Sequence, residues 1–270
     1  MQKIVFNAHY LMYFDTAIAE YWRALGLPYE ATMQQLGGDL YVKKATVEFN
    51  ASARMDDQLE VALRCGRIGQ SSMVFNGAIF RASQLLITCE LVYVFADPAS
   101  QSSRPVPQAL REILAGYEAG ETMVRVETDD WGRLQSGAAP VRTQVFVDEQ
   151  QIPVEMEWDA ADAGAMHAVA WNRLGQPLAT GRLLRRAPGV AQIGRMAVIQ
   201  PQRGCGLGKL VLDALVAAAL ERGDHQVVLQ AQRGAESFYR QRGFQPRGEP
   251  FDEAGIPHIE MFADLPLSSA

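Results

Sequence analysis

The sequence predicts two domains of different class, an α+β domain followed by an α/β domain. The chain has 270 residues, more than the roughly 100–200 residues of one ordinary domain. In the first half, one strongly apolar helix is followed by runs in which apolar and polar residues alternate, which is typical of strands. In the second half, strand-like and helix-like segments alternate, which is typical of an α/β domain. We therefore expect domains at residues 1–120 and 121–270.

The composition excludes several classes of protein. Hydrophobic residues make up 48% and charged residues 21% of the chain, as in soluble globular proteins. The most apolar stretch, at 210–220, is too short to span a bilayer and contains Asp213, and residues 1–10 lack the features of a signal peptide. The three cysteines are far apart, which indicates a reducing compartment with neither a disulfide framework nor a zinc site. We expect a cytoplasmic protein that binds neither metal nor membrane.

The net charge of −6 disfavours non-specific binding to nucleic acid, but the charges are unevenly distributed. Residues 121–162 contain ten acidic and three basic side chains, and residues 182–247 contain eleven basic and four acidic ones. Two interpretations are open. Either the two segments are solvated faces that neutralise each other, or an anion-binding segment lies beside an acidic one that receives a cationic substrate.

The first domain begins with a predicted helix at residues 8–25, a stretch without glycine or proline. Tyr10 and Phe14 follow helical spacing, and few polar residues remain on the other faces, which is usual for a buried helix. Asn7 can cap the start of this helix, and Pro28 lies just beyond its end.

Four segments of the first domain alternate apolar with polar residues and are separated by short polar turns, which predicts an antiparallel meander. One buried helix with such a sheet indicates that the sheet wraps around the helix. A further amphipathic helix, expected at 108–118, closes the domain. The expected strands are residues 40–50, 58–69, 72–82 and 84–96.

The second domain combines strands and helices in an order that predicts an α/β fold of about 150 residues. One strand runs directly into a helix through a glycine-rich turn. The expected strands are 123–128, 166–172, 178–184, 191–199, 226–231 and 257–263, and the expected helical segments are 130–150, 207–222 and 235–242.

The glycine-rich turn carries glycine at positions 204, 206 and 208. A bare backbone ahead of a helix presents several N–H groups and the positive end of the helix dipole to a phosphate. Arg195, Arg203 and Lys209 can add charged contacts. A dinucleotide-binding fingerprint would need glycine in place of Lys209, and a P-loop would need Ser or Thr in place of Leu210. The alternative is a turn that binds no ligand.

Arg203-x-x-Gly206-x-Gly208 is followed by the pattern A-x-x-F-Y-x-x-x-G-F at 235–244. With Arg195–Val198 and the segments 141–150 and 255–261, these motifs resemble the GNAT superfamily of N-acetyltransferases over residues 122–265. The resemblance implies acyl transfer from acetyl-CoA or another acyl-CoA, as co-substrate, to a small-molecule or peptide amine. It also implies that coenzyme A is bound by Met196, Ala197, Val198, Arg203, Gly204, Cys205, Gly206, Leu207, Gly208 and Lys209.

Aminolysis of a thioester needs a neutral amine, a stabilised oxyanion and a proton for the leaving thiolate. A lysine or terminal amine is mostly protonated at neutral pH, so a base or a chain of waters must remove a proton. Tyr239 occupies the usual general-acid position of the superfamily, or is a core residue packed among phenylalanines. Glu149, Glu155 and His258 are candidate bases, and each is also explained as a surface or structural residue. Cys205 has no evident base partner, and we interpret it as a small filler.

Residues 5–15, V-F-N-A-H-Y-L-M-Y-F-D, lead into the predicted buried helix. With the sheet that follows, they resemble the hotdog fold of 4-hydroxybenzoyl-CoA thioesterase-like enzymes over residues 2–118. In that family the helix N-terminus polarises the thioester carbonyl, which implies an oxyanion site at the amides of Ala8, His9 and Tyr10. His9 either hydrogen-bonds substrate or packs in the core. Because hotdog domains usually pair their sheets, the resemblance also implies a homo-oligomer formed through this domain.

The catalytic Asp of the thioesterase family would fall one residue ahead of Met1, together with the first strand of the sheet. We expect either a start further upstream or an N-terminal half without hydrolase activity. The first hypothesis is a bifunctional fusion of an acyl-CoA thioesterase with a GNAT acyltransferase. One alternative is a catalytic GNAT half with an inactive hotdog half that serves oligomerisation or acyl-CoA sensing. The other is a regulator whose two halves only bind acyl-CoA.

Overall fold

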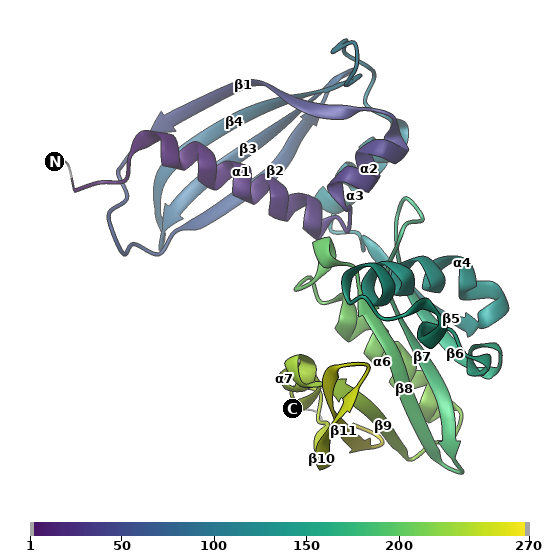
Figure 1. Ribbon diagram of the computed structural model, residues 1–270. Helices are drawn as coiled ribbons and strands as arrows, with labels where there is room; N and C mark the ends of the chain where they lie inside the picture. The colour runs from purple at the N-terminus through teal and green to yellow at the C-terminus, as the bar shows by residue number, and fades with distance from the viewer. Residues whose placement is uncertain (1–2, 268–270) are drawn as a thin grey trace. The chain divides into compact units, whose positions relative to one another are not determined.

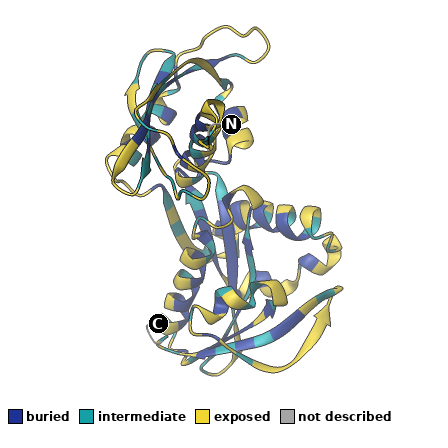
Figure 2. Cartoon of the chain, turned by 90° about the vertical axis from the view of Figure 1, so that its left-hand side faces the viewer, coloured by how far each residue is buried: buried dark blue, intermediate teal, exposed yellow. Residues whose placement is uncertain are grey.

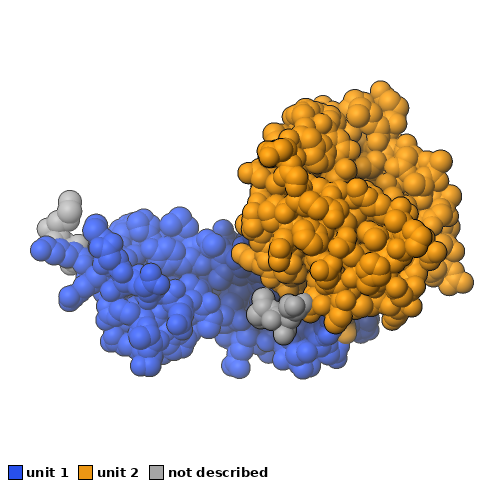
Figure 3. Space-filling model, turned by 90° about the horizontal axis from the view of Figure 1, so that it is seen from below, with its two compact units in different colours: residues 1–123 blue, residues 124–270 orange. Residues whose placement is uncertain are grey.

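The computed structural model describes residues 3–267 and divides the chain into two compact units (Figures 1 and 3). The chain passes from unit 1 to unit 2 between Met123 and Val124. A division into compact units does not define where each family domain ends. The domain boundary expected between residues 120 and 121 therefore stays a prediction.

Unit 1 consists of a four-stranded antiparallel sheet and a long helix that lies across one of its faces (Figure 1). The sheet has the order β1-β4-β3-β2, so the expected meander is wrong for the first strand, which pairs with β4 from Asp39 opposite Ala96 to Phe49 opposite Ile87. The chain at 50–59 crosses the sheet and does not form a hairpin. The elements are α1 (Asn7–Ala24), β1 (Asp39–Phe49), β2 (Glu60–Ile68), β3 (Ser72–Arg81) and β4 (Gln84–Ala96).

Helix α1 packs closely on the sheet because Gly77 of β3 has no side chain. A Cβ atom at Gly77 would lie 2.5 Å from the ring of Phe14, too close for any side chain without movement. Further along the helix, the ring of Tyr21 lies 5.3 Å from that of Phe75. At the start of the helix, the hydroxyl of the buried Tyr10 accepts a hydrogen bond from the amide of Ala53 at 2.9 Å.

The structure corrects two expectations about α1. Its N-cap is Phe6, not Asn7, and no side chain caps it. The helix buries only one face, since Leu11 is 42% and Met12 is 55% exposed, so burial on all sides was the wrong inference from its composition. Aromatic and aliphatic residues on an outer face are compatible with a helix that covers a sheet from one side.

Two more helices complete unit 1. Helix α3 (Gln108–Glu118) has the predicted bounds and buries Leu110, Ile113 and Leu114. Helix α2 (Tyr29–Leu36) was not predicted. It follows Pro28 and ends at Gly37, which adopts the left-handed conformation with φ of 69°, as a helix C-terminus commonly requires.

Unit 2 is a seven-stranded sheet of order β10-β11-β9-β8-β7-β6-β5. Strands β8 and β9 run parallel, and the other neighbours are antiparallel. The buried residues of unit 2 gather in its central strands (Figure 2). The strands are β5 (Val124–Asp130), β6 (Met166–Asn172), β7 (Pro177–Ala187), β8 (Val190–Val198), β9 (Gln226–Gln232), β10 (Gln245–Glu253) and β11 (Ile256–Asp264).

Helices α4 (Trp131–Arg142) and α6 (Leu207–Glu221) cover opposite faces of this sheet. A Cβ atom built on Gly137 of α4 would meet Val169 of β6 at 3.0 Å. A Cβ atom built on Gly181 of β7 would meet Val211 of α6, also at 3.0 Å. Gly181 is paired with Ala168, the neighbour of Val169. Because successive residues of a strand face opposite sides, Gly181 and Val169 lie on opposite faces of the sheet, and so do the two helices that they contact.

The predicted helical segment at 130–150 is α-helical only as far as Arg142. It continues as a π-helical turn, η1 (Thr143–Glu149), followed by the short helix α5 (Val154–Glu157). The last predicted helix is a 3₁₀ turn, η4 (Arg233–Ala235), and α7 (Glu236–Arg240). Strand β10 was not predicted, because Pro246, Gly248 and Pro250 interrupt it and most of its residues are exposed.

Within residues 3–267, no helix is both long enough and apolar enough to cross a membrane. The three cysteines are free thiols. Among the same residues, His, Cys, Asp and Glu side chains form no group of three or more that could hold a metal ion.

Candidate functional site

The parallel strands β8 and β9 pair over only part of their length. Their register runs from Val190 opposite Gln226 to Ile193 opposite Leu229 and ends there. On the other side of β8, Gly194 pairs with Arg182 and Ala197 with Thr180, so β8 has an extra residue in this stretch, which is a β-bulge. The bulge includes Arg195, whose φ of 51° is left-handed. Beyond Ile193, β8 therefore presents backbone N–H and C=O groups to a gap in the sheet.

The glycine-rich turn follows β8 and leads into α6. A 3₁₀ turn, η3 (Gln200–Gln202), comes first, and both Gly204 and Gly206 have φ of 82°. The amide of Leu210 donates to the carbonyl of Gly206 at 3.2 Å. The amides from Gly206 to Lys209 thus precede this helical hydrogen bond and lie at the positive end of the helix dipole, which is the geometry that binds a phosphate.

The side chain of Arg203 holds this turn in place. Its two terminal nitrogens donate to the carboxylate oxygens of Glu149 at 2.6 Å each, and its Nε donates to the carbonyl of Val198 at 3.0 Å. The hydrogen bonds from Arg203 keep the pKa of Glu149 below its usual value. Lys209 is exposed at the first turn of α6. The guanidinium of Arg203 therefore positions the turn, while the coenzyme contacts expected of Arg203 and Lys209 stay predictions.

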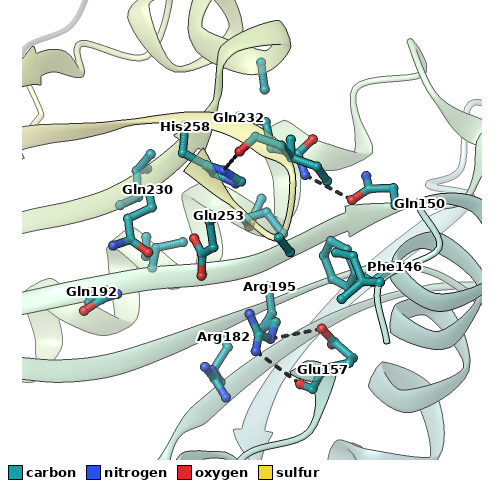
Figure 4. Close-up of a pocket in the computed structure, with 18 of the residues that line it drawn as sticks. Phe146, Gln150, Glu157, Arg182, Gln192, Arg195, Gln230, Gln232, Glu253 and His258 are labelled. Atoms are coloured by element: carbon teal, nitrogen blue, oxygen red, sulfur yellow. Dashed lines mark hydrogen bonds and ion pairs between the residues drawn. The ribbon is translucent and has the colours of Figure 1, made fainter. Parts of the chain in front are cut away.

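A pocket of ≈ 360 Å³ lies against the diverging part of β8 and β9 (Figure 4). The β10–β11 hairpin, η1 and α5 supply its other walls. Four residues singled out from the sequence line it, namely Arg195, Met196, Tyr239 and His258. Glu149 and Glu155 do not belong to its lining, and Glu155 is exposed on α5.

Tyr239 lines the pocket and is also packed as a core residue. It is 7% exposed, and its ring lies 5.0 Å from that of Phe238 and 5.9 Å from that of Phe244. Burial raises the pKa of Tyr239 to about 12. Its phenol is therefore protonated at neutral pH and can donate a proton or a hydrogen bond.

His258 reaches the pocket from β11 and is 8% exposed. Its Nδ1 lies 2.8 Å from the carbonyl oxygen of Ile256, and its ring stacks on Phe251 at 5.9 Å. Since a carbonyl oxygen can only accept, Nδ1 must carry the hydrogen. In the neutral ring, Nε2 then has the free lone pair that a general base needs.

A network of arginines and carboxylates forms the floor of the pocket on the α5 side (Figure 4). Arg195 lies 3.2 Å from Glu157 between Nε and Oε2, and its Nη2 donates to the carbonyl of Glu157 at 3.2 Å. Arg182 donates to Asp159 at 2.7 Å and to Asp162 at 2.8 Å. Burial raises the pKa of Glu157, whereas hydrogen bonds from Arg142 and Arg182 lower the pKa of Asp162 despite its burial.

Arg142 anchors this network from α4 and is fully buried. Its guanidinium lies between two rings, 5.4 Å from the centroid of Trp131 and 4.6 Å from that of Trp158. It donates to the carbonyl of Glu157 and to Asp162, both at 2.8 Å. The short helix α5 is thereby held against the sheet.

Sequence reasoning missed the pocket residues Glu157, Asp159 and Arg182. The available signal was the charge imbalance between residues 121–162 and 182–247. Ion pairs join these two segments, among them Glu149 with Arg203, Glu157 with Arg195, and both Asp159 and Asp162 with Arg182. At the site, the neutralising interpretation of that imbalance is therefore the one that the structure supports.

The residues singled out in unit 1 lie at the start of α1. His9 is exposed, its ring lies 5.9 Å from that of Phe6 and its amide donates to the carbonyl of Phe6 at 2.9 Å. Tyr10 is buried and serves packing. The first turn of α1 contains no acidic residue. The carboxylate expected ahead of Met1 lies outside the described residues, and the catalytic role of His9 stays a prediction.

Comparison with known proteins assigns both units. Residues 135–265 match the model of the acetyltransferase (GNAT) domain family, and residues 2–88 match that of the thioesterase superfamily. The uncharacterised N-acetyltransferase YjcF of Bacillus subtilis is 35% identical over 46% of this chain and 88% of its own. The acyl-CoA thioester hydrolase YbgC of Escherichia coli is 30% identical over 40% of this chain and 80% of its own.

Among solved structures, a protein of Lactobacillus plantarum named as an N-acetyltransferase is 28% identical and matches with a TM-score of 0.51. The match covers 53% of this chain and 99% of that protein. Folds, motifs and relatives agree for each unit. The chain therefore belongs to two families, as a fusion of a thioesterase-superfamily hotdog domain with a GNAT acetyltransferase domain.

Proposed function

We propose that the C-terminal domain, residues 121–270, transfers an acetyl or other acyl group from acyl-CoA to an amine. The observation that carries this proposal is the divergence of β8 from β9 next to a pocket lined by both Tyr239 and His258. A gap of this kind admits the thioester arm between two strands, and the phenol of Tyr239 and the imidazole of His258 are suited to act on it as acid and base.

The backbone supplies the contacts to coenzyme A. The amides from Gly206 to Lys209 bind the diphosphate at the start of α6. The backbone groups of Met196 and Ala197 that face the gap bind the amides of the pantetheine arm, as an added strand would. Arg203 fixes the turn through its bonds to Glu149 and Val198.

The side chains then move protons. The amine nitrogen attacks the thioester carbonyl, Nε2 of His258 takes a proton from that nitrogen and later releases it to solvent, and the new N–C bond forms as the C–S bond breaks. Tyr239 gives its proton to the departing thiolate and recovers one from solvent. Glu149 is held ionised by Arg203 and lies outside the pocket lining, so it is a weaker candidate for the base than His258.

We propose further that the N-terminal domain, residues 1–120, hydrolyses acyl-CoA thioesters and forms a homo-oligomer. This proposal is supported by the family match and by the similarity to YbgC. The amide of Ala8 would polarise the carbonyl, with the side chain of His9 beside it, whereas the amide of His9 already donates to the carbonyl of Phe6. The alternative is an inactive domain that serves oligomerisation or acyl-CoA sensing.

Release of free thiol from acetyl-CoA by the full chain tests these assignments, with and without added amines. Amine-dependent release that Tyr239→Phe abolishes supports transfer by the C-terminal domain. Amine-independent release that survives Tyr239→Phe but falls in His9→Ala supports hydrolysis by the N-terminal domain. Binding of acetyl-CoA without any release would leave only the regulatory function, and no heat of binding in calorimetry would contradict all three.

A further inference from the structure

We infer that the acceptor is a small diamine or polyamine, whose second, non-reacting ammonium group is bound by Glu253. This inference rests on the proposed acyl transfer in the same pocket. It is drawn from the charged side chains that line the pocket, most of which are paired with one another, whereas Glu253 is not paired with any residue that the structure describes.

Most charged side chains of the pocket are paired. Arg195 lies 3.2 Å from Glu157, and Arg182 lies 2.7 Å from Asp159. Both arginines are held within this network, so neither is free to bind an anionic group of the substrate. The paired groups cancel, and they leave this part of the pocket without net charge.

Glu253 lines the same pocket and differs from these residues. Within the described part of the chain, its carboxylate has no ion pair and no hydrogen bond. Its backbone is fixed, because Glu253 pairs with Ile256 across a tight turn in which Ala254 and Gly255 have φ of 53° and 77°. Glu253 is exposed, so the pocket carries an uncompensated carboxylate at its β10–β11 rim, which attracts a cation.

The neighbours of Glu253 are neutral and hydrogen-bonding. Gln192 of β8 and Gln230 of β9 lie on the same side of the pocket (Figure 4), and farther along Gln232 donates to Gln150 at 3.0 Å. Amide side chains can bind the polar parts of a substrate without neutralising Glu253. A distal ammonium is therefore attracted at this end of the pocket, whereas a distal carboxylate is repelled.

The test compares three acceptors of similar length in steady-state transfer from acetyl-CoA by the full chain. These are 1,5-diaminopentane, pentylamine and 5-aminopentanoate, at equal concentrations of free amine. We expect the diamine to have a kcat/KM about fivefold above that of pentylamine, as for a partly exposed ion pair, and 5-aminopentanoate to be the poorest substrate.

Two substitutions of Glu253 test whether this residue causes the preference for the diamine. Glu253→Gln should raise KM for the diamine to the value for pentylamine and leave kcat for both unchanged. Glu253→Lys should make 5-aminopentanoate the better substrate. Glu249→Gln is the matched control, since Glu249 is an exposed residue of the same strand that does not line the pocket, and it should keep the preference for the diamine.

Equal turnover of diamine and pentylamine by the wild type would overturn the inference while leaving acyl transfer in place. So would an equal loss for both amines in Glu253→Gln, which would mean that Glu253 acts on the reacting amine. If the wild type acetylates none of the three amines although it binds acetyl-CoA, the proposed function fails, and the inference fails with it.

Discussion

Among single residues, Tyr239 combines two roles that the sequence left as alternatives, since it packs between Phe238 and Phe244 and also lines the pocket. Tyr239→Phe removes only the hydroxyl and keeps the packing. We expect kcat of transfer to fall about 100-fold or more, as for loss of a general acid, with coenzyme affinity unchanged in calorimetry. Equal turnover by variant and wild type would exclude Tyr239 from the chemistry.

The raised pKa of Tyr239 makes a prediction about pH. A pKa of about 12 means that the phenol keeps its proton well above neutral pH, whereas a free tyrosine loses it near pH 10. The rate of transfer should therefore show no loss near pH 10 that depends on Tyr239. A pH profile of wild type and Tyr239→Phe checks this, and a step near pH 10 present only in the wild type would contradict it.

The glycines of the turn between β8 and α6 are predicted to differ in their effect on coenzyme binding. Gly206 needs a left-handed φ of 82°, which costs an alanine about 1–2 kcal/mol, so Gly206→Ala should weaken coenzyme A binding about tenfold. Gly208 has no such requirement, and a Cβ atom there would make only ordinary contacts of 3.6 Å with Phe238 and Val198. Gly208→Ala is therefore the control, and similar affinities of the two variants in calorimetry would argue against this role of the turn.

At the scale of elements, α5 is held to the sheet by buried charge and not by strand pairing. Arg142→Met would leave Glu157 and Asp162 short of a partner and should lower the free energy of unfolding of unit 2 by about 3–5 kcal/mol. Arg133→Met, in the same helix, removes only an exposed contact of 3.2 Å to Asp129 and should cost less than about 1 kcal/mol. Thermal unfolding followed by tryptophan fluorescence distinguishes the two, and equal effects would contradict a supporting role of the buried network.

Elements could be predicted where the local pattern is strong. The alternating residues of β3 and β4 and the amphipathic spacing of α3 predict their structures almost to the residue. Strand β10 has no such pattern, because its stability comes from pairing with β11 while its side chains face solvent. The order of β1 in the sheet was wrong because alternation predicts a strand but not its partner.

At the scale of the whole chain, two CoA-related domains share one polypeptide, and each has its own buried residues. The main core of unit 2 consists of residues from Val141 to Ala263. We expect residues 124–270, expressed alone, to fold and to bind coenzyme A with the affinity of the full chain, as measured by calorimetry. A soluble, folded fragment that does not bind would show that the site needs the first 123 residues.

The same scale explains what the sequence could not predict about the site. The glycine turn, Tyr239 and His258 belong to motifs that are contiguous in sequence. The partners Glu149 and Arg203, by contrast, are far apart in the chain and meet only in the folded domain. The opposite net charges of residues 121–162 and 182–247 predict that ion pairs form between the two segments. They do not predict which residues form these pairs, or that Glu253 has no ion pair among the described residues.

Gly77 has a consequence for the hydrolysis proposed for unit 1. Its missing methyl group lets the helix lie close to the strands, since even an alanine would press on the ring of Phe14. Either that ring or the helix must shift on substitution, and a shift of the helix carries its opening turn with it. We therefore expect the proposed hydrolysis to be sensitive to a change in the middle of a strand that alters no polar group.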